Sequence, residues 1–290
     1  STLRNDWMVL LGLGVCALKS KRWYTAGLLL GWGAMIRAFP VLALLFLAVP
    51  TGWKLLEAWR GRRSGASETG SPWAPLVPLI KVGIGVVLIA GALGAASTAT
   101  FGWDQSWGQW SDKIAMHANK PNVNHFGLRA NIGYKADNLW HRLSARGQDP
   151  ELWGPLTTQT LEDRWWLLSL SMLFYVLLAL VACRRVRLSD AAVIGTMMIP
   201  VFFYPSNYYL HILFIWPLLL AAWSTRDGDR SWSLIAATVL GACTLKWFGW
   251  LIPGNYGQFL FWSGLLLGLI AVLLVLTIMA NRRRAIAETA

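Results

Sequence analysis

The sequence predicts an all-α fold, a polytopic transmembrane bundle of about nine helices with amphipathic helices at the external interface. The 290 residues are 56% hydrophobic and only 14% charged, whereas water-soluble domains carry about 25% charged residues. The apolar residues form long blocks, several of which approach the roughly 20 residues that cross about 30 Å of hydrocarbon. The basic residues, which give a net charge of +12, lie in short loops between these blocks. A nucleic-acid partner is therefore not expected, because it requires basic residues gathered on one water-facing surface.

Nine apolar segments follow one another along the chain. Four of them are short, and a helix of about 14 residues covers only about 21 Å, so these segments must extend into polar flanks or pair as hairpins. The segments comprise residues 7–18, 24–37, 39–53, 75–99, 165–183, 190–204, 207–223, 231–249 and 256–280.

This pattern divides the chain into three regions. Residues 1–100 are expected to form transmembrane helices with a basic cytoplasmic loop at 54–72. Residues 101–164 form an external loop with interfacial helices, and residues 165–290 form further transmembrane helices and a short basic cytoplasmic tail.

The stretch from Tyr24 to Trp53 is either one long tilted helix or two short helices that turn between Arg37 and Pro40. Lys and Arg accumulate on the cytoplasmic side of membrane proteins. Two helices place all five basic clusters of the chain on one face, whereas a single helix leaves the first cluster opposite the others. We therefore predict a hairpin, with Arg37 at the external face. The clusters are Lys19, Lys21 and Arg22; Lys54, Arg60, Arg62 and Arg63; Arg184, Arg185 and Arg187; Arg226 and Arg230; and Arg282, Arg283 and Arg284.

Small residues four apart predict where helix backbones approach closely in lipid. The pairs are Gly27 with Gly31, Gly264 with Gly268, and Gly91 with Ala95.

The external loop begins with an amphipathic pattern. Trp103, Trp107, Trp110 and Ile114 recur at helical spacing, which predicts a helix lying in the interface with its indoles in the headgroup layer. A polar run rich in Asn, His, Lys and Arg follows at 117–131. Such side chains suit a hydroxyl-rich or phosphorylated ligand, but an ordered loop whose Asn side chains satisfy turns is the simpler interpretation.

Several short motifs follow one another in a familiar order. Arg4-Asn-Asp-Trp7 opens the first helix, and Ala26-Gly-Leu-Leu-Leu-Gly31 precedes Arg37-Ala-Phe-Pro40. Lys113-Ile-Ala-Met-His117 and Asn124-His-Phe-Gly-Leu-Arg129 follow in the external loop. This order resembles the later portion of GT-C type integral-membrane glycosyltransferases, particularly the family 87, alpha-mannosyltransferase-like branch, over most of the chain.

The resemblance implies that a mannose-like sugar moves from a polyprenyl-phosphate donor to an acceptor on the external face. It also implies an integral protein of the bacterial inner (plasma) membrane, with loop 101–164 external. The donor is a substrate, and no cofactor or metal is expected, since the sequence has no His-rich pair. The expected partners are membrane lipids, the polyprenyl-phosphate lipid and other membrane subunits.

The resemblance also suggests roles for individual residues. In the family, the catalytic carboxylate typically lies in the first external loop, which is expected upstream of Ser1. Among external carboxylates here, none matches the family motif; the candidates are Asp6, Asp104 and Asp112. Substrate phosphate is assigned to Arg37, Arg129 and Lys246, and the sugar to Asn124, His125 and His211.

The sequence leaves enzyme activity open. The alternative is a non-catalytic membrane scaffold subunit of a larger complex, derived from the same fold. A transporter ranks third, because no carboxylate lies in mid-span and no inverted repeat is visible.

Overall fold

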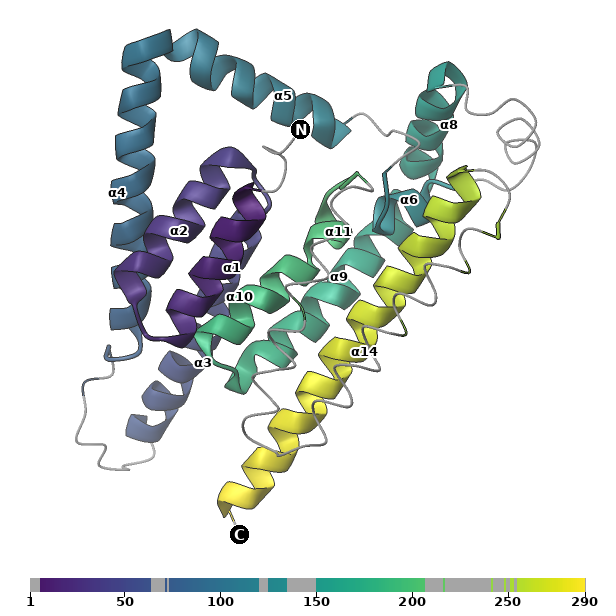
Figure 1. The fold of residues 1–290 in the computed structure, drawn as a ribbon. Helices are drawn as coiled ribbons and strands as arrows, with labels where there is room; N and C mark the ends of the chain where they lie inside the picture. Colours follow the sequence, from purple (N-terminus) through teal and green to yellow (C-terminus); the bar gives the residue numbers. More distant parts are fainter. Residues whose placement is uncertain are drawn as a thin grey trace. The chain divides into compact units, whose positions relative to one another are not determined.

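The computed structural model describes most of the chain, and every regular element that it describes is a helix (Figure 1). Four of these helices are long and apolar enough to cross a membrane. They comprise Pro40–Arg62, Leu76–Phe101, Trp165–Arg185 and Gly257–Arg282. The described elements confirm the predicted all-α class, and the four long apolar helices indicate a membrane protein. The described residues are 6–63, 71, 73–119, 125–134, 150–206, 216, 241, 248, 251–252 and 255–289.

The number of crossings stays a prediction. Two of the nine predicted segments, 207–223 and 231–249, fall almost wholly outside the described residues. The other seven coincide with helices of the structure.

The predicted hairpin at Arg37 is confirmed. Helix α2 ends at Ile36 and α3 begins at Pro40. Proline suits this first helical position because its φ angle is already helical and its missing N–H would have no intrahelical partner. The residue before proline avoids helical geometry, so the chain must turn at this point. The first four helices are α1 (Asp6–Lys19), α2 (Trp23–Ile36), α3 (Pro40–Arg63) and α4 (Leu76–Phe101).

Glycines let α2 and α4 pack closely. A Cβ atom at Gly27 would collide with the carbonyl of Val82, and one at Gly31 would come within 2.8 Å of the Ile89 side chain. The predicted packing role of the Gly27 and Gly31 pair is confirmed.

The other two small-residue pairs behave differently. Added Cβ atoms at Gly91 and Gly268 would meet nothing within 4 Å among the described residues, so a close helix approach at these two positions stays a prediction. Gly264 instead faces the Asn131 amide at 3.5 Å.

Residues 101–164, the predicted external loop, contain short helices, as predicted. After a turn at Gly102, which has a φ of 77°, a π-helical segment leads into α5, and the indole N–H of Trp107 donates to the hydroxyl of Thr98 at 3.1 Å. Trp103 is 67% exposed and remains available to lipid. The elements of this loop are η2 (Asp104–Gly108), α5 (Gln109–Asn119), α6 (Leu128–Ile132) and α8 (Pro150–Asp163).

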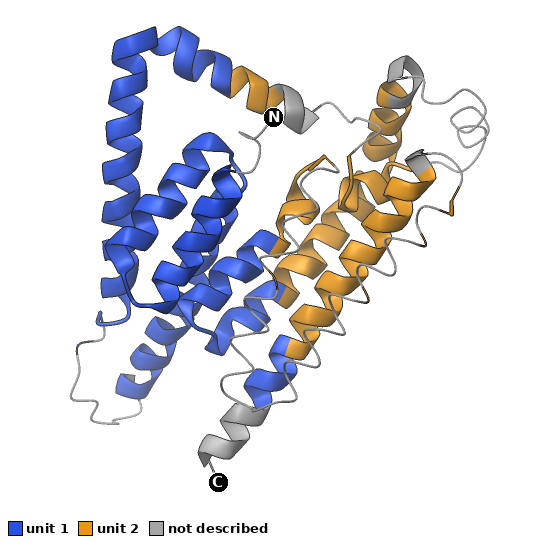
Figure 2. Ribbon diagram, viewed as in Figure 1, with its two compact units in different colours: residues 1–110, 179–196, 277–290 blue, residues 111–178, 197–276 orange. Residues whose placement is uncertain are grey.

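The remaining helices complete two compact units (Figure 2). Unit 1 contains residues 1–110, 179–196 and 277–290, and unit 2 contains residues 111–178 and 197–276. The remaining elements are α9 (Trp165–Ala182), η3 (Cys183–Arg185), α10 (Leu188–Met197), α11 (Ile199–Phe202) and α14 (Asn255–Thr289).

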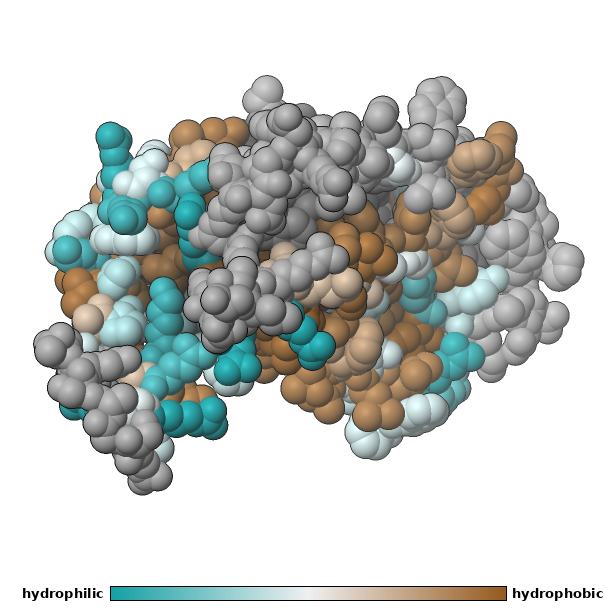
Figure 3. Space-filling model, turned by 90° about the horizontal axis from the view of Figure 1, so that it is seen from below, coloured by the Kyte–Doolittle hydropathy of each residue, from teal (hydrophilic) through white to brown (hydrophobic). Residues whose placement is uncertain are grey.

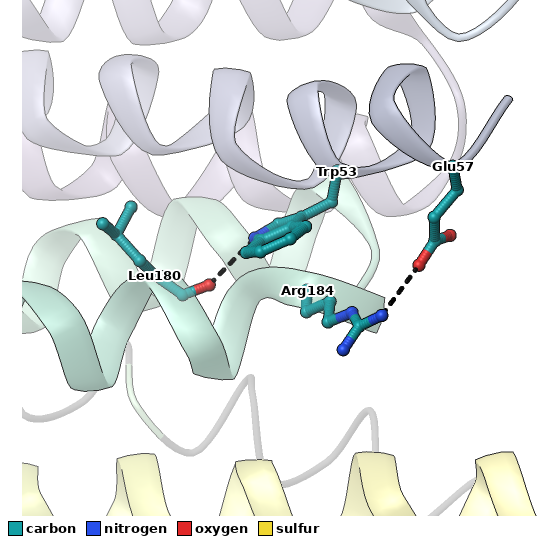
Figure 4. A network of polar contacts seen from close by, with 4 residues as sticks. All are labelled: Trp53, Glu57, Leu180 and Arg184. Atoms are coloured by element: carbon teal, nitrogen blue, oxygen red, sulfur yellow. Dashed lines mark hydrogen bonds and ion pairs between the residues drawn. The ribbon is translucent and has the colours of Figure 1, made fainter. Parts of the chain in front are cut away.

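Polar contacts tie three helices together at one end of unit 1, and Figure 4 shows those between α3 and the end of α9. The Trp53 indole N–H of α3 donates to the carbonyl oxygen of Leu180 at 3.2 Å. Arg184 pairs with Glu57 at 3.5 Å, and its guanidinium lies 5.3 Å from the Trp53 ring. The carbonyl of Ala182 accepts a 2.9 Å hydrogen bond from the Asn281 amide. The last carbonyls of α9, which have no partner within their own helix, are satisfied in this way.

Four of the five basic clusters lie at this end of unit 1. The clusters at Lys54, Arg184 and Arg282 adjoin the contacts just described. The cluster at Lys19 belongs to the turn before α2, whose first residues contact the first part of α4. Figure 3 views the molecule from below and shows hydrophilic and hydrophobic side chains side by side on this face. The two-helix interpretation of Tyr24 to Trp53 requires this arrangement, while the cytoplasmic location of the end stays a prediction.

Candidate functional site

Residues 125–131, the described end of the polar run in the predicted external loop, fold into a largely buried cluster in unit 2. His125 forms an isolated antiparallel bridge with Ser206, and the Phe126 N–H donates to the carbonyl oxygen of Pro205 at 3.0 Å. The run therefore lies against the turn that follows α11, although the two segments are far apart in the sequence.

Gly127 anchors this run to α14. Its N–H donates to the Ser263 hydroxyl at 3.0 Å, and that hydroxyl donates to the carbonyl oxygen of Phe259 at 2.6 Å. Gly127 has a φ of 110°, and a Cβ atom there would collide with the carbonyl oxygen of Pro200. Only glycine fits this position, because it alone combines the left-handed backbone with the missing side chain.

Asn131 inserts its amide into the backbone of α14. It donates to the carbonyl oxygen of Leu260 at 3.1 Å and accepts from the N–H of Gly264 at 3.2 Å. These two backbone groups are the pair that an uninterrupted α-helix would join. The side chain thus provides an additional hydrogen-bond partner to each of these two groups.

An aromatic ring joins the two candidate ligand residues. The rings of His125 and Tyr204 lie 5.4 Å apart and are tilted by 31°. The Arg129 guanidinium carbon lies 5.5 Å from the centre of the Tyr204 ring, a cation–π geometry. His125 is 6% and Tyr204 7% exposed. The structure therefore brings two sequence-predicted residues together through a third.

The Tyr204 hydroxyl is a hydrogen-bond donor at neutral pH. Burial raises its pKa to about 12, and the nearby Arg129 charge only partly opposes this. Within the described part of the chain its oxygen is buried and has no hydrogen-bond partner. An anionic ligand oxygen beside Arg129 would satisfy it, because a phenol donates readily to an anion.

Arg164 holds the end of α6 in place. Its Nη1 donates to the carbonyl oxygens of Ile132 at 3.1 Å and Tyr134 at 2.7 Å. A cation at a helix C-terminus satisfies free carbonyls and favours the helix dipole. Burial also raises the pKa of the Tyr134 phenol. We assign Arg164 a supporting role for α6 rather than a ligand role.

Of the other predicted ligand residues, the structure describes only Arg37, which does not belong to this cluster. Arg37 is half-buried in the turn between α2 and α3, in unit 1. Asn124, His211 and Lys246 lie outside the described residues, so their assignments stay predictions.

The three candidate carboxylates are exposed. Asp6 begins α1 beside the Arg37 turn, because the neighbouring Trp7 ring lies 5.7 Å from that of Phe39. Asp104 lies in η2 and Asp112 in α5. Among the residues that the structure describes, no three His, Cys, Asp or Glu side chains gather as a possible metal site.

Sequence reasoning missed two members of the cluster, Tyr204 and Ser263. The turn beginning at Tyr204 does show one usable signal, a tyrosine and a serine around Pro205 directly after an apolar segment. Ser263 lies within a long apolar helix and has no such signal.

Comparison of the chain with models of protein families, with curated proteins and with solved structures finds no match.

Proposed function

We propose that this chain is a membrane glycosyltransferase, or the greater part of one, which moves a mannose-like sugar from a polyprenyl-phosphate donor to an acceptor on the external face. One observation carries the proposal: Arg129 and an unsatisfied Tyr204 hydroxyl are placed together in a buried cluster, with His125 on the other side of the same ring. This combination of a cation, a neutral donor and an imidazole suits a phosphate linked to a sugar.

The depth of the cluster along α14 supports an external, lipid-linked donor. Ser263 lies about 28 Å along the helix axis from Arg282, at 1.5 Å per residue. That distance is close to the thickness of the hydrocarbon core, about 30 Å. If the Arg282 end is cytoplasmic by the positive-inside rule, the cluster lies near the outer headgroup layer, where a polyprenyl phosphate presents its phosphate.

Each side chain then has a chemical role. Arg129 pairs with the phosphate and stabilises the charge that develops when the lipid phosphate leaves. Tyr204 donates to a phosphate oxygen, and His125 contacts sugar hydroxyls, since imidazole donates and accepts. Asn124, His211 and Lys246 keep the assigned contacts with phosphate or sugar as part of this proposal, and the assignment of Arg37, which lies in unit 1, to a phosphate stays a separate prediction.

The acceptor hydroxyl must lose a proton to a carboxylate base during transfer. Among the described residues, the candidates for this base are the exposed carboxylates Asp6, Asp104 and Asp112. Replacement of Asp6, Asp104 or Asp112 by Asn tests the three exposed alternatives one at a time.

Substitution of two tyrosines of unit 2 distinguishes an effect on ligand binding from an effect on stability. The Tyr175 hydroxyl donates to the carbonyl oxygen of Leu267 at 3.1 Å, whereas that of Tyr204 has no partner in the described chain. Tyr204→Phe should leave thermal unfolding in detergent unchanged and weaken polyprenyl-phosphate binding about 10- to 100-fold, because a hydrogen bond to a charged group contributes about 1.5–3 kcal/mol.

Tyr175→Phe is the matched control, expected to lower the unfolding temperature without changing lipid binding. Native mass spectrometry with a short polyprenyl phosphate, and with the corresponding unphosphorylated alcohol, measures binding. Equal affinity of Tyr204→Phe and wild type for the phosphorylated lipid would remove Tyr204 from the site.

The scaffold alternative rests on a different observation. Helix α9 exposes much of its apolar surface, including Trp165, Leu170 and Phe174, and such a surface faces either lipid or another subunit. Isolation of the protein from native membrane shows whether lipid or another subunit covers this surface. Co-purification of stoichiometric membrane subunits, together with no polyprenyl-phosphate binding, would favour the scaffold.

A further inference from the structure

Unit 1 contains two cation–aromatic pairs that differ in charge balance. The Arg184 guanidinium lies 5.3 Å from the Trp53 ring and is also paired with the Glu57 carboxylate (Figure 4). The Lys81 ammonium lies 5.9 Å from the Tyr24 ring. Within the described ranges, no carboxylate forms an ion pair with Lys81. The first pair carries its own counter-charge, and the second does not.

Lys81 lies within a helix that is long and apolar enough to span the membrane. It is about 8 Å from the start of α4 at 1.5 Å per residue, and the nearby side chains of Val77, Ile80 and Ile84 are exposed. A charge in such a helix is costly unless it reaches the headgroup layer or an opposite charge. A lysine side chain one or two turns inside the interface reaches lipid phosphates by extending along the helix surface.

The position of Tyr24 relative to Lys81 is fixed by the backbone. Gly27 and Gly85 allow α2 and α4 to approach so closely that a Cβ atom at either position would collide with the facing helix. Tyr24 lies one turn before Gly27, and Lys81 one turn before Gly85. The pair is therefore held together by the most tightly packed contact of these two helices and needs little ordering on binding.

The surroundings of the pair are basic and accessible. Lys21 and Arg22 are exposed in the turn that precedes α2, and they lie at the end of unit 1 that carries four basic clusters. In this part of unit 1, Glu57 is already paired with Arg184. An anionic group approaching from the membrane would meet several cations and an aromatic hydroxyl.

We propose that Lys81, Tyr24 and the Lys21–Arg22 turn form a binding site for the headgroup of an anionic phospholipid. The ammonium of Lys81 pairs with the phosphate, the phenol of Tyr24 donates to it, and the turn contributes long-range attraction. The acyl chains lie along the exposed apolar face of α4. This site is independent of the sugar-donor site, and the leaflet at the basic end is the one that is rich in anionic lipids.

Native mass spectrometry of the full chain in detergent tests the site with phosphatidylglycerol and, as a zwitterionic comparison, phosphatidylcholine. Wild type should retain phosphatidylglycerol in preference to phosphatidylcholine. Lys81→Gln should reduce retained phosphatidylglycerol at least fivefold, whereas Lys81→Arg should keep it. Arg184→Gln is the matched control and should change retention less than twofold, because Glu57 already balances that charge.

Two further measurements keep the test interpretable. Thermal unfolding of Lys81→Gln should match wild type without added lipid, and lipid should raise the unfolding temperature of wild type only. Excess inorganic phosphate should not displace the lipid, because the free ion lacks the acyl chains. Equal retention of phosphatidylglycerol by wild type and Lys81→Gln, or displacement by free phosphate, would overturn the site.

Discussion

Two contacts bring backbones together by different means. The first joins α2 and α4, and the second joins residues 125–134 and α14. The first relies on absent side chains, since Gly27 and Gly85 leave room for the facing helix. The second relies on side-chain hydrogen bonds, in which Ser263 and Asn131 join the backbones of the two segments. Apolar surroundings favour the first because no polar group is left unsatisfied. The second introduces polar groups that the fold must pair, and it lies beside the candidate ligand residues.

Gly127→Ala should have the largest effect on stability, because it distorts the backbone at the residue whose N–H bonds to Ser263 of α14. The left-handed backbone costs about 1–3 kcal/mol for a non-glycine residue, and the collision with Pro200 adds about 1–3 kcal/mol. We expect little folded protein in detergent by size-exclusion chromatography. Gly154→Ala is the control, since no described atom lies within 4 Å of its added Cβ. Normal yield of Gly127→Ala would show that this backbone conformation is dispensable.

Alkaline pH should weaken the polar contact more than the apolar one. The folded pKa of Tyr204 is raised to about 12 from an ordinary 10.0. Between these values the unfolded chain loses the proton while the folded chain keeps it, so stability falls as pH rises from 10 to 12. The loss is on the order of 2–3 kcal/mol. Thermal unfolding across this range should fall less steeply for Tyr204→Phe, and identical slopes would contradict the assignment.

Gly27→Ala tests the apolar contact. The added methyl group meets the Val82 carbonyl, and overpacking of this kind costs about 1–3 kcal/mol. Gly83→Ala on the facing helix has open space among the described residues and should be neutral or stabilising, because alanine favours a helix by about 1 kcal/mol. The unfolding temperatures of the two variants should differ in opposite directions from wild type.

Asn131 should show the smallest and most informative difference. Asn131→Ala removes both side-chain bonds, but the Leu260 carbonyl and the Gly264 N–H are a pair that the helix itself joins, so the loss should be about 1 kcal/mol. Asn131→Asp keeps the shape and turns an acceptor towards the Leu260 carbonyl, which should cost more. An alanine variant less stable than the aspartate variant in chemical denaturation would exclude insertion into the helix backbone.

Local sequence patterns were sufficient to predict most of the described helices. The apolar blocks match α1 to α4, α9 and α14, and Pro40 with the distribution of basic clusters identified the hairpin at Arg37. These features depend on neighbouring residues and on the charge of short loops, both of which are visible along the chain.

Small-residue pairs show the limit of such patterns. Gly27 and Gly31 contact another helix, whereas Gly268, in an identical spacing with Gly264, faces open space among the described residues. The motif indicates that a second helix can approach closely, but the surface that packs against it comes from a distant part of the chain.

The candidate site was visible in part. The sequence alone identified His125 and Arg129 as residues suited to a phosphorylated sugar, and it determined a helical membrane protein with one strongly basic end. Only the tertiary structure placed Tyr204 between His125 and Arg129 and brought the unbalanced Lys81 beside Tyr24. Hydropathy and charge are properties of single segments, whereas the partner of a buried hydroxyl or cation depends on which distant segments pack against each other.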